Sequence, residues 1–211
     1  MNQYQVVRDN QTHSYGRNRL ELYKSLLQPH FLFNSLNNLY AISIHRSEQT
    51  PEAIAGLSHL LERIVSFSSK DLIPLSEEIR LIEDYLALEK IWLGKDAFFL
   101  DFQVKGNTSD FGVPPLTIYT FVENAFKHGI RRSGHKGWIT IHLTVKNDRV
   151  LLKIRNSAEP DTKEDAASQT GLGIEAVKRL LDGTYRKRYV LDARYIGDVF
   201  AVDLIICRMA A

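Results

Sequence analysis

The stretch WITIHLTVKNDRVLLKIRN, residues 138–156, decides the fold of this chain. Apolar and polar residues alternate on both sides of Asn147-Asp148, which is the pattern of two half-buried strands. Asparagine and aspartate tolerate the left-handed backbone that a two-residue hairpin turn requires. The sequence therefore predicts an antiparallel hairpin with one apolar face that other elements must cover.

Other strand-like and helical stretches surround this hairpin. The strand-like stretches are AFFLDFQV at 97–104, RKRYVLDARY at 186–195 and VFAVDLIIC at 199–207. Gly197-Asp198 is expected to turn the last two into a second hairpin. Residues 116–128 and 172–181 have helical character, and the first of these helices is expected to end at Gly129. Several strands with two helices able to cover one face predict an α+β domain.

The first half of the chain is predicted to be helical. From residue 17 to about residue 44, apolar residues recur at helical spacing, with an interruption at Pro29. A second helix is expected to begin at Pro51. Its apolar stripe would consist of Ile54, Leu57, Leu61, Ile64 and Val65. Since a lone hairpin of two amphipathic helices cannot cover both stripes, we expect a second copy to complete a four-helix bundle.

A third helix is expected after a break at Ile73-Pro74. Ser76 is its expected cap, and Glu77 and Glu78 lie in the first turn, where carboxylates favour the positive end of the helix dipole. The helix is expected to end near Leu93, where helical patterns give way to strand patterns. This change predicts a domain boundary, and the predicted parts are a linker or cut end at 1–16, a helical region at 17–94 and an α+β domain at 95–211.

Composition excludes several classes of protein. The formal net charge of +2 is too small and too dispersed for a nucleic-acid surface, so no nucleic-acid partner is expected. A single cysteine rules out an internal disulfide and a cysteine-based zinc site, and fits a reducing compartment. No apolar run approaches the ~20 residues that cross a bilayer.

Two segments of the second half have the residue types of an anion and metal site. In TGLGIEAVKRL, residues 170–180, Gly171 and Gly173 let the backbone approach a phosphate at a helix start. In FVENAFKHG, residues 121–129, Asn124 can ligate Mg²⁺ and Lys127, three residues on, can hold a phosphate oxygen. Taken singly, a tight turn and a solvated helix end explain the two segments at least as well.

The segment LLQPHFLFNSLNNL, residues 26–39, places polar groups on one side of an apolar helix. At 100° per residue, His30, Asn34, Asn37 and Asn38 occupy an arc roughly 100° wide. On these residues alone, an ordinary surface histidine is the better explanation of His30.

Together, the two segments of the second half resemble the nucleotide site of the GHKL ATPases, the superfamily of histidine kinases, gyrase-type topoisomerases and Hsp90-type chaperones. Adding PHFLFN narrows the resemblance to the autolysin-sensor (LytS-like) sensor histidine kinases. Five pieces carry it in the family's order: Pro29 to Asn37, Tyr85 to Lys90, Pro114-Pro115, Val122 to Gly129 and Gly171 to Ile174. The resemblance covers about residues 20–207.

The resemblance implies a fold and a reaction. The expected fold is a helical-hairpin dimerisation and phosphoacceptor region followed by a GHKL (Bergerat) α/β sandwich that binds ATP. The expected protein is the kinase core of a two-component system, which phosphorylates itself on His30 from Mg-ATP and passes the phosphoryl group to an aspartate of a response regulator. Asn34, one turn after His30, corresponds to a polar residue that supports phosphatase activity in related kinases.

The resemblance also assigns the nucleotide site. Asn124 would hold Mg²⁺, Lys127 would grip phosphate and His128 would lie near the ribose or base. Gly171 and Gly173 would form the phosphate-side turn.

One position departs from the family's pattern. The family's adenine-binding aspartate is replaced by Asn156, an uncharged and weaker acceptor. This favours, as an alternative, a nucleotide-impaired relay or scaffold. An ATP-hydrolysing protein is a third candidate, but its general-base glutamate would stand where Thr120 stands.

The expected partners are a second copy of the chain and a response-regulator receiver domain. The family is commonly tethered to the inner face of a bacterial membrane. A cytoplasmic portion of an inner-membrane protein, with a tether before residue 1, is therefore the expected location.

Overall fold

The predicted hairpin forms the centre of a five-stranded sheet. In the computed structural model, residues 29–94, 96–130, 137–158 and 172–208 are described. The hairpin consists of β4 (Gly137–Lys146) and β5 (Arg149–Ser157). Asn147 and Asp148 have φ values of 50° and 57°, so both adopt the left-handed backbone expected of the turn.

The remaining strands extend the sheet on both sides of this hairpin, in the order β2-β4-β5-β7-β6. They are β2 (Phe98–Lys105), β6 (Tyr189–Ile196) and β7 (Val199–Cys207). Strand β2 runs parallel to β4, and the other neighbours are antiparallel. The predicted strands and the Gly197-Asp198 turn are confirmed, and Gly197 has a φ of 57°.

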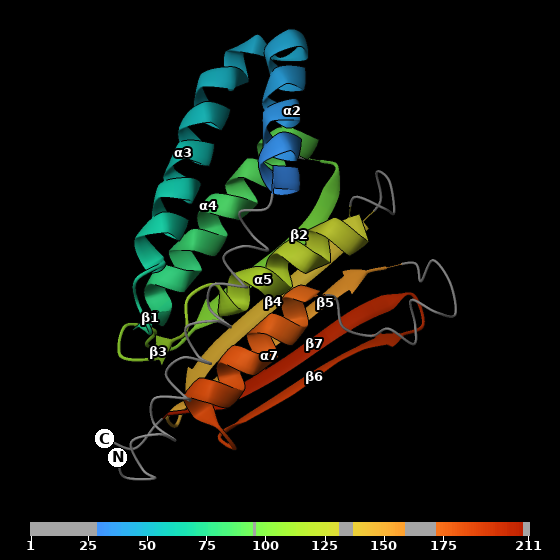
Figure 1. Ribbon diagram of the computed structural model, residues 1–211. Coiled ribbons are helices and arrows are strands. Elements are labelled where there is room, and N and C mark those ends of the chain that lie inside the picture. The colour runs from blue at the N-terminus through green and yellow to red at the C-terminus, as the bar shows by residue number, and fades with distance from the viewer. Residues whose placement is uncertain (1–28, 95, 131–136, 159–171, 209–211) are drawn as a thin grey trace.

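The alternation of the strands buries one face of the sheet. On β4 and β5 the buried apolar residues are Ile139, Ile141, Leu143, Val150, Leu152 and Ile154. Two helices, α5 (Thr117–Ala125) and α7 (Leu172–Tyr185), lie across this face (Figure 1). The opposite face carries exposed polar side chains such as His142 and Lys153. This is the predicted α+β arrangement of one covered sheet.

The first half of the chain forms the predicted helices. Helix α2 (Pro29–His45) and helix α3 (Thr50–Phe67) are joined by the short 3-10 helix Ser47–Gln49 and form a hairpin that extends away from the sheet (Figure 1). Helix α4 (Leu75–Leu93) lies between α3 and α5. The part of the first predicted helix before residue 29 lies outside the described residues.

The apolar stripe predicted for α3 was partly wrong. Its buried residues are Ala53, Leu57, Leu60, Ile64 and Phe67, which repeat at helical spacing. Two members of the predicted stripe, Ile54 and Val65, are exposed because each is one position, about 100°, away from a buried residue. Their exposure leaves an apolar surface on the hairpin.

The start of α4 also differs from the prediction. Pro74 occupies the N-cap position and no side chain caps the helix, so Ser76 is not the cap. A two-stranded sheet fixes the helix start instead, because β1 (Ile73–Pro74) pairs with β3 (Gly112–Val113) and the Leu75 amide donates to the Phe111 carbonyl at 2.7 Å. These pairs join residues about forty positions apart, which local patterns do not reveal.

An aromatic cluster connects α4 to the elements of the second half. The ring centroids of Tyr85 on α4 and Tyr119 on α5 are 5.2 Å apart, and Tyr85 is 5.6 Å from Phe126. Phe126 in turn lies 5.1 Å from Phe98 on β2. Edge-to-face rings at these distances add to the free energy of burial. Helix α4 is therefore packed against the sheet domain as well as against the hairpin.

Candidate functional site

The position of α5 depends on a carboxylate from another helix. Glu78 of α4 is fully buried and accepts the backbone N–H of Leu116 at 2.9 Å, Ile118 at 2.9 Å and Tyr119 at 3.0 Å. These are orphan donors of the kind that every helix start leaves unpaired. Glu78 was expected to act on the dipole of its own helix, whereas its carboxylate serves the start of α5.

Burial raises the pKa of Glu78 to about 7, and the three N–H donors oppose this shift without cancelling it. The residue that Glu78 holds is itself strained. Leu116 has a φ of 66°, a left-handed conformation that costs a non-glycine residue ~1–2 kcal/mol. The bond from its N–H to Glu78 helps to maintain this conformation.

Asn124 lies in the last turn of α5, close to the start of α7. Its side chain is half-buried, and its Nδ2 is buried without a hydrogen-bond partner among the described residues. A Cβ atom at Gly173 would lie 3.4 Å from Asn124 Nδ2 and 3.1 Å from Thr120 Cγ2. The two predicted motifs therefore meet in the fold. Gly171 and the Leu172 side chain lie outside the described residues.

A π-helical turn, Phe126–Ile130, follows α5 in place of the predicted continuous α-helix to residue 128. Phe126 and Ile130 are buried, and Lys127 between them is exposed. A π-helical turn is rare and occurs frequently at functional sites. The backbone of His128 lies in this turn, and its side chain is outside the described part of the structure.

Gly129 brings this turn against β5. A Cβ atom at Gly129 would lie 2.3 Å from Asn156 Nδ2 and 2.5 Å from the Ser157 carbonyl oxygen, so only glycine fits. Asn156 is buried, and its Nδ2 donates to the Ser157 carbonyl at 2.9 Å. Its Oδ1 has no partner among the described residues. A buried acceptor of this kind is expected to have a partner, which an external donor can supply.

The hydroxyl of Thr120 is hydrogen-bonded to the backbone at the start of its own helix. Its side chain is buried, and its Oγ1 donates to the Leu116 carbonyl at 2.5 Å. A hydroxyl in this position does not remove a proton from water at neutral pH. Thr120 therefore supplies no general base.

Only the backbone of His30 is described, in the first turn of α2. Asn34, one turn on, has a half-buried side chain in the same helix. Because the imidazole is outside the described residues, the roles of His30 and Asn34 stay predictions.

Sequence reasoning missed the contribution of Glu78 to α5. The available signal was the pair of acidic residues Glu77 and Glu78 at the start of α4, followed by apolar residues at helical spacing. Acidic residues are common in the first turn of any helix, so this signal does not point to α5. The partners of Glu78 are 38 to 41 residues away in the chain.

A family model and curated relatives both relate this chain to sensor histidine kinases. The family model described as histidine kinase matches residues 18–97. Sensor protein LytS of Staphylococcus haemolyticus is 27% identical over 175 residues, which cover 78% of this chain and 30% of that protein. Sensor histidine kinase YpdA of Escherichia coli is 30% identical over 139 residues, which cover 65% of this chain and 24% of that protein. The chain thus spans less than a third of these curated relatives.

A solved structure shares the fold. The histidine kinase domain of the blue-light activated histidine kinase EL346 of Erythrobacter litoralis aligns with a TM-score of 0.52 over 94% of each chain, at 17% sequence identity. At this identity the likeness shows the fold alone.

Proposed function

We propose, on the premise that this chain is related to the LytS-like sensor histidine kinases, that it is the kinase core of a two-component sensor. The proposed reaction transfers the terminal phosphoryl group of ATP to His30 and then to an aspartate of a response-regulator receiver domain. The observation that carries the proposal is that Asn124 and Gly173, from two motifs about fifty residues apart, lie next to each other, as a shared nucleotide site requires.

The described residues fit a nucleotide. Asn156 Oδ1 is a buried acceptor without a partner among them, which suits an amino group of a base. Asn124 offers an amide oxygen for Mg²⁺, and the exposed Lys127 offers an ammonium group for phosphate. We assign His128 to the ribose or base and Gly171 with Gly173 to the phosphate-side turn.

When bound, ATP would supply the phosphoryl group, and its Mg²⁺ would neutralise part of the negative charge of the phosphates. The chain's own contribution is positioning, since phosphoryl transfer needs in-line approach and charge neutralisation more than covalent help. His30 would provide the accepting ring nitrogen, and Asn34, one turn on, would hydrogen-bond the ring or orient a water. Thr120, bonded to its own helix, gives water no base, which favours transfer to histidine over hydrolysis.

We also propose that the chain forms a homodimer through the α2–α3 hairpin. Among the large apolar side chains exposed on α2 are Phe33, Leu36, Tyr40 and Ile44. They recur at three- and four-residue intervals and so form one stripe along the helix. Ile54 and Val65 of α3 add to the exposed apolar surface. A second hairpin would cover these side chains in a four-helix bundle.

We place this core in the cytoplasm, where cellular ATP is available. Within the described residues, no helix combines the length and the apolar character that spanning a membrane requires.

A nucleotide-impaired scaffold is the second candidate, and Asn156 favours it. The amide oxygen of Asn156 is a weaker acceptor than the carboxylate of the family's aspartate. The Nδ2 of Asn156 already donates to the Ser157 carbonyl. Calorimetry with Mg-ATP separates the two candidates. Binding at micromolar to submillimolar nucleotide supports the kinase, whereas no detectable binding at millimolar nucleotide supports the scaffold. GTP and ADP as competitors test the selectivity that Asn156 confers.

Phosphorylation of His30 is tested with ATP labelled on its terminal phosphate. The expected product is protein-bound phosphate that is labile in acid and stable in alkali, and it should disappear in His30→Gln. His45→Gln, a variant at the other end of α2, is the matched control and should keep the label. Label that persists in His30→Gln would contradict the assignment.

A further inference from the structure

We propose that Glu78 is a positioning residue for the nucleotide site: its buried carboxylate holds the start of α5 and thereby fixes Asn124 at the other end of the same helix. This inference rests on the proposed function, because it takes Asn124 as the magnesium ligand. Glu78 is not part of the sequence motifs that identify the nucleotide site, because it lies in the preceding helix α4.

The hydrogen bonds define how the carboxylate holds the helix. Oε1 accepts the N–H groups of Ile118 and Tyr119, and Oε2 accepts that of Leu116. Helix α5 has no side-chain cap of its own. Its N-cap is an apolar leucine, which has no side-chain acceptor to offer. The carboxylate from α4 therefore replaces the capping residue that α5 lacks.

Helix α5 is short and enclosed, so a shift at its start reaches Asn124. It has nine residues, and residues 117–122 are all buried. At 1.5 Å of rise per residue, Asn124 lies only about 10 Å along the axis from Thr117. The left-handed Leu116 precedes this rigid segment, and Thr120 bonds back to its carbonyl. Release of Leu116 would therefore allow the whole helix to move rather than a single loop.

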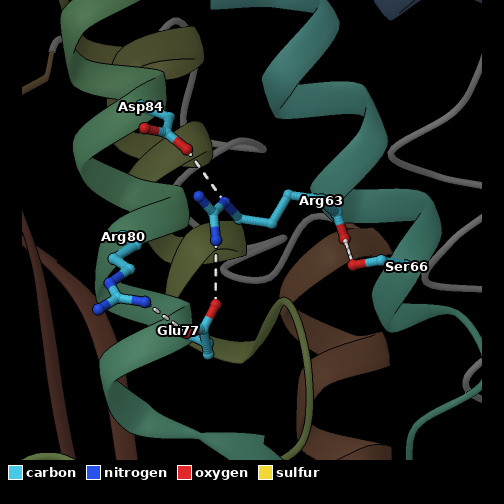
Figure 2. A network of polar contacts seen from close by, with 5 residues as sticks. All are labelled: Arg63, Ser66, Glu77, Arg80 and Asp84. Atoms are coloured by element: carbon cyan, nitrogen blue, oxygen red, sulfur yellow. Dashed lines mark hydrogen bonds and ion pairs between the residues drawn. The ribbon is translucent and has the colours of Figure 1, made fainter.

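The neighbouring carboxylate fixes α4 on its other side. Glu77 accepts Arg63 Nη1 of α3 at 3.0 Å, and Asp84, further along α4, accepts Arg63 Nε at 3.0 Å (Figure 2). Glu77 therefore ties α4 to the hairpin that carries His30, and Glu78 ties α4 to the helix that carries Asn124. Two adjacent residues thus link the predicted phosphoacceptor region to the predicted nucleotide site.

Glu78→Gln in the full chain tests this role, with Glu77→Gln as the matched control. Glutamine keeps one acceptor oxygen and replaces the other with an NH₂ group, which would face a backbone donor. We expect at least tenfold faster amide hydrogen exchange at Ile118 and Tyr119, a shifted side-chain NH₂ resonance of Asn124 in NMR spectra, and at least fivefold weaker Mg-ATP binding. Among the described residues, Glu77→Gln breaks the ion pairs with Arg63 and Arg80, so α5 and Asn124 should be unchanged.

Glu78→Asp separates positioning from general destabilisation. It keeps both acceptor oxygens at a shorter reach, and we expect it to restore part of the Asn124 resonance and of the Mg-ATP affinity. An unchanged Asn124 resonance in Glu78→Gln, or exchange that rises uniformly over the molecule, would overturn the proposal. If Glu78→Gln does not fold, the same readouts on Glu78→Asp decide.

A parent chain that binds no Mg-ATP would refute the proposed function separately. The Asn124 resonance of the nucleotide-free protein then still shows whether Glu78 fixes this side chain.

Discussion

At the scale of single residues, the protonation of Glu78 should make stability depend on pH. Its pKa is about 7 in the folded chain against an ordinary value of 4.5, so between these pH values the folded state keeps a proton that the unfolded state loses. The free energy of unfolding should therefore fall as the pH rises from about 4.5 to about 7. At ~1.4 kcal/mol per pKa unit, this contribution is about 3 kcal/mol. Urea denaturation at pH 5 and pH 8 measures it.

Glu78→Gln should remove this part of the pH dependence. Other groups titrate too, and hydrogen bonds from His142 and Gln103 lower the pKa of Asp101, which acts in the opposite direction. Such contributions are common to both proteins and cancel in the difference between them. If the free energy of unfolding changes equally with pH in the parent and in Glu78→Gln, Glu78 keeps an ordinary pKa.

Gly129 permits the contact between the π-helical turn and β5. In Gly129→Ala the new methyl group would meet Asn156 Nδ2 and the Ser157 carbonyl at less than van der Waals distance. We expect a loss of ~1–3 kcal/mol in the free energy of unfolding and weaker nucleotide binding, because Asn156 must move. At Gly112, a Cβ would find its nearest neighbour at an ordinary 3.6 Å. Gly112→Ala is therefore the control, and a similar loss in both variants would contradict the prediction.

At the scale of elements, Arg63 joins α3 to α4 through two carboxylates. Its side chain is 29% exposed, so solvent screens these ion pairs only in part. Arg63→Ala should lower the free energy of unfolding by ~1 kcal/mol, and the loss should shrink at high salt. Arg80→Ala removes a more exposed ion pair to the same Glu77 and should cost less. Chemical denaturation at low and high salt compares the two variants. Equal losses of unfolding free energy would show that the link from α3 to α4 through Arg63 does not add to stability.

At the scale of the whole molecule, the exposed stripe of α2 should hold two copies together. The parent chain should sediment as a dimer, and Tyr40→Glu, which places a charge on a side chain that is 69% exposed, should shift it toward the monomer. The unfolding of each copy should change little, since that side chain does not enter the core of one chain. Val190→Glu, on an exposed position of β6, is the control and should stay dimeric. A monomeric parent chain would contradict the proposed bundle.

The residues of the candidate site could be proposed from the sequence, but the contacts that hold their helices in position could not. Asn124, Lys127 and Gly173 were predicted as site residues from residue type and spacing, and the structure brings Asn124 and Gly173 together. The π-helical turn at 126–130 was not foreseen, because its sequence has no pattern that distinguishes it from the end of an α-helix. Gly129, which lies against Asn156, was foreseen only as a helix end.

The sequence by itself determined the strands of the five-stranded sheet, the main helices and the hairpin turns, because apolar periodicity and left-handed turn residues act over a few neighbouring positions. Only the tertiary structure decided that Ile54 and Val65 face outward and that Glu78 caps α5 rather than its own helix. The physical reason is that a buried carboxylate must find its donors wherever the fold brings unpaired N–H groups. Those groups came from 38 to 41 residues away, a distance over which no local pattern carries information.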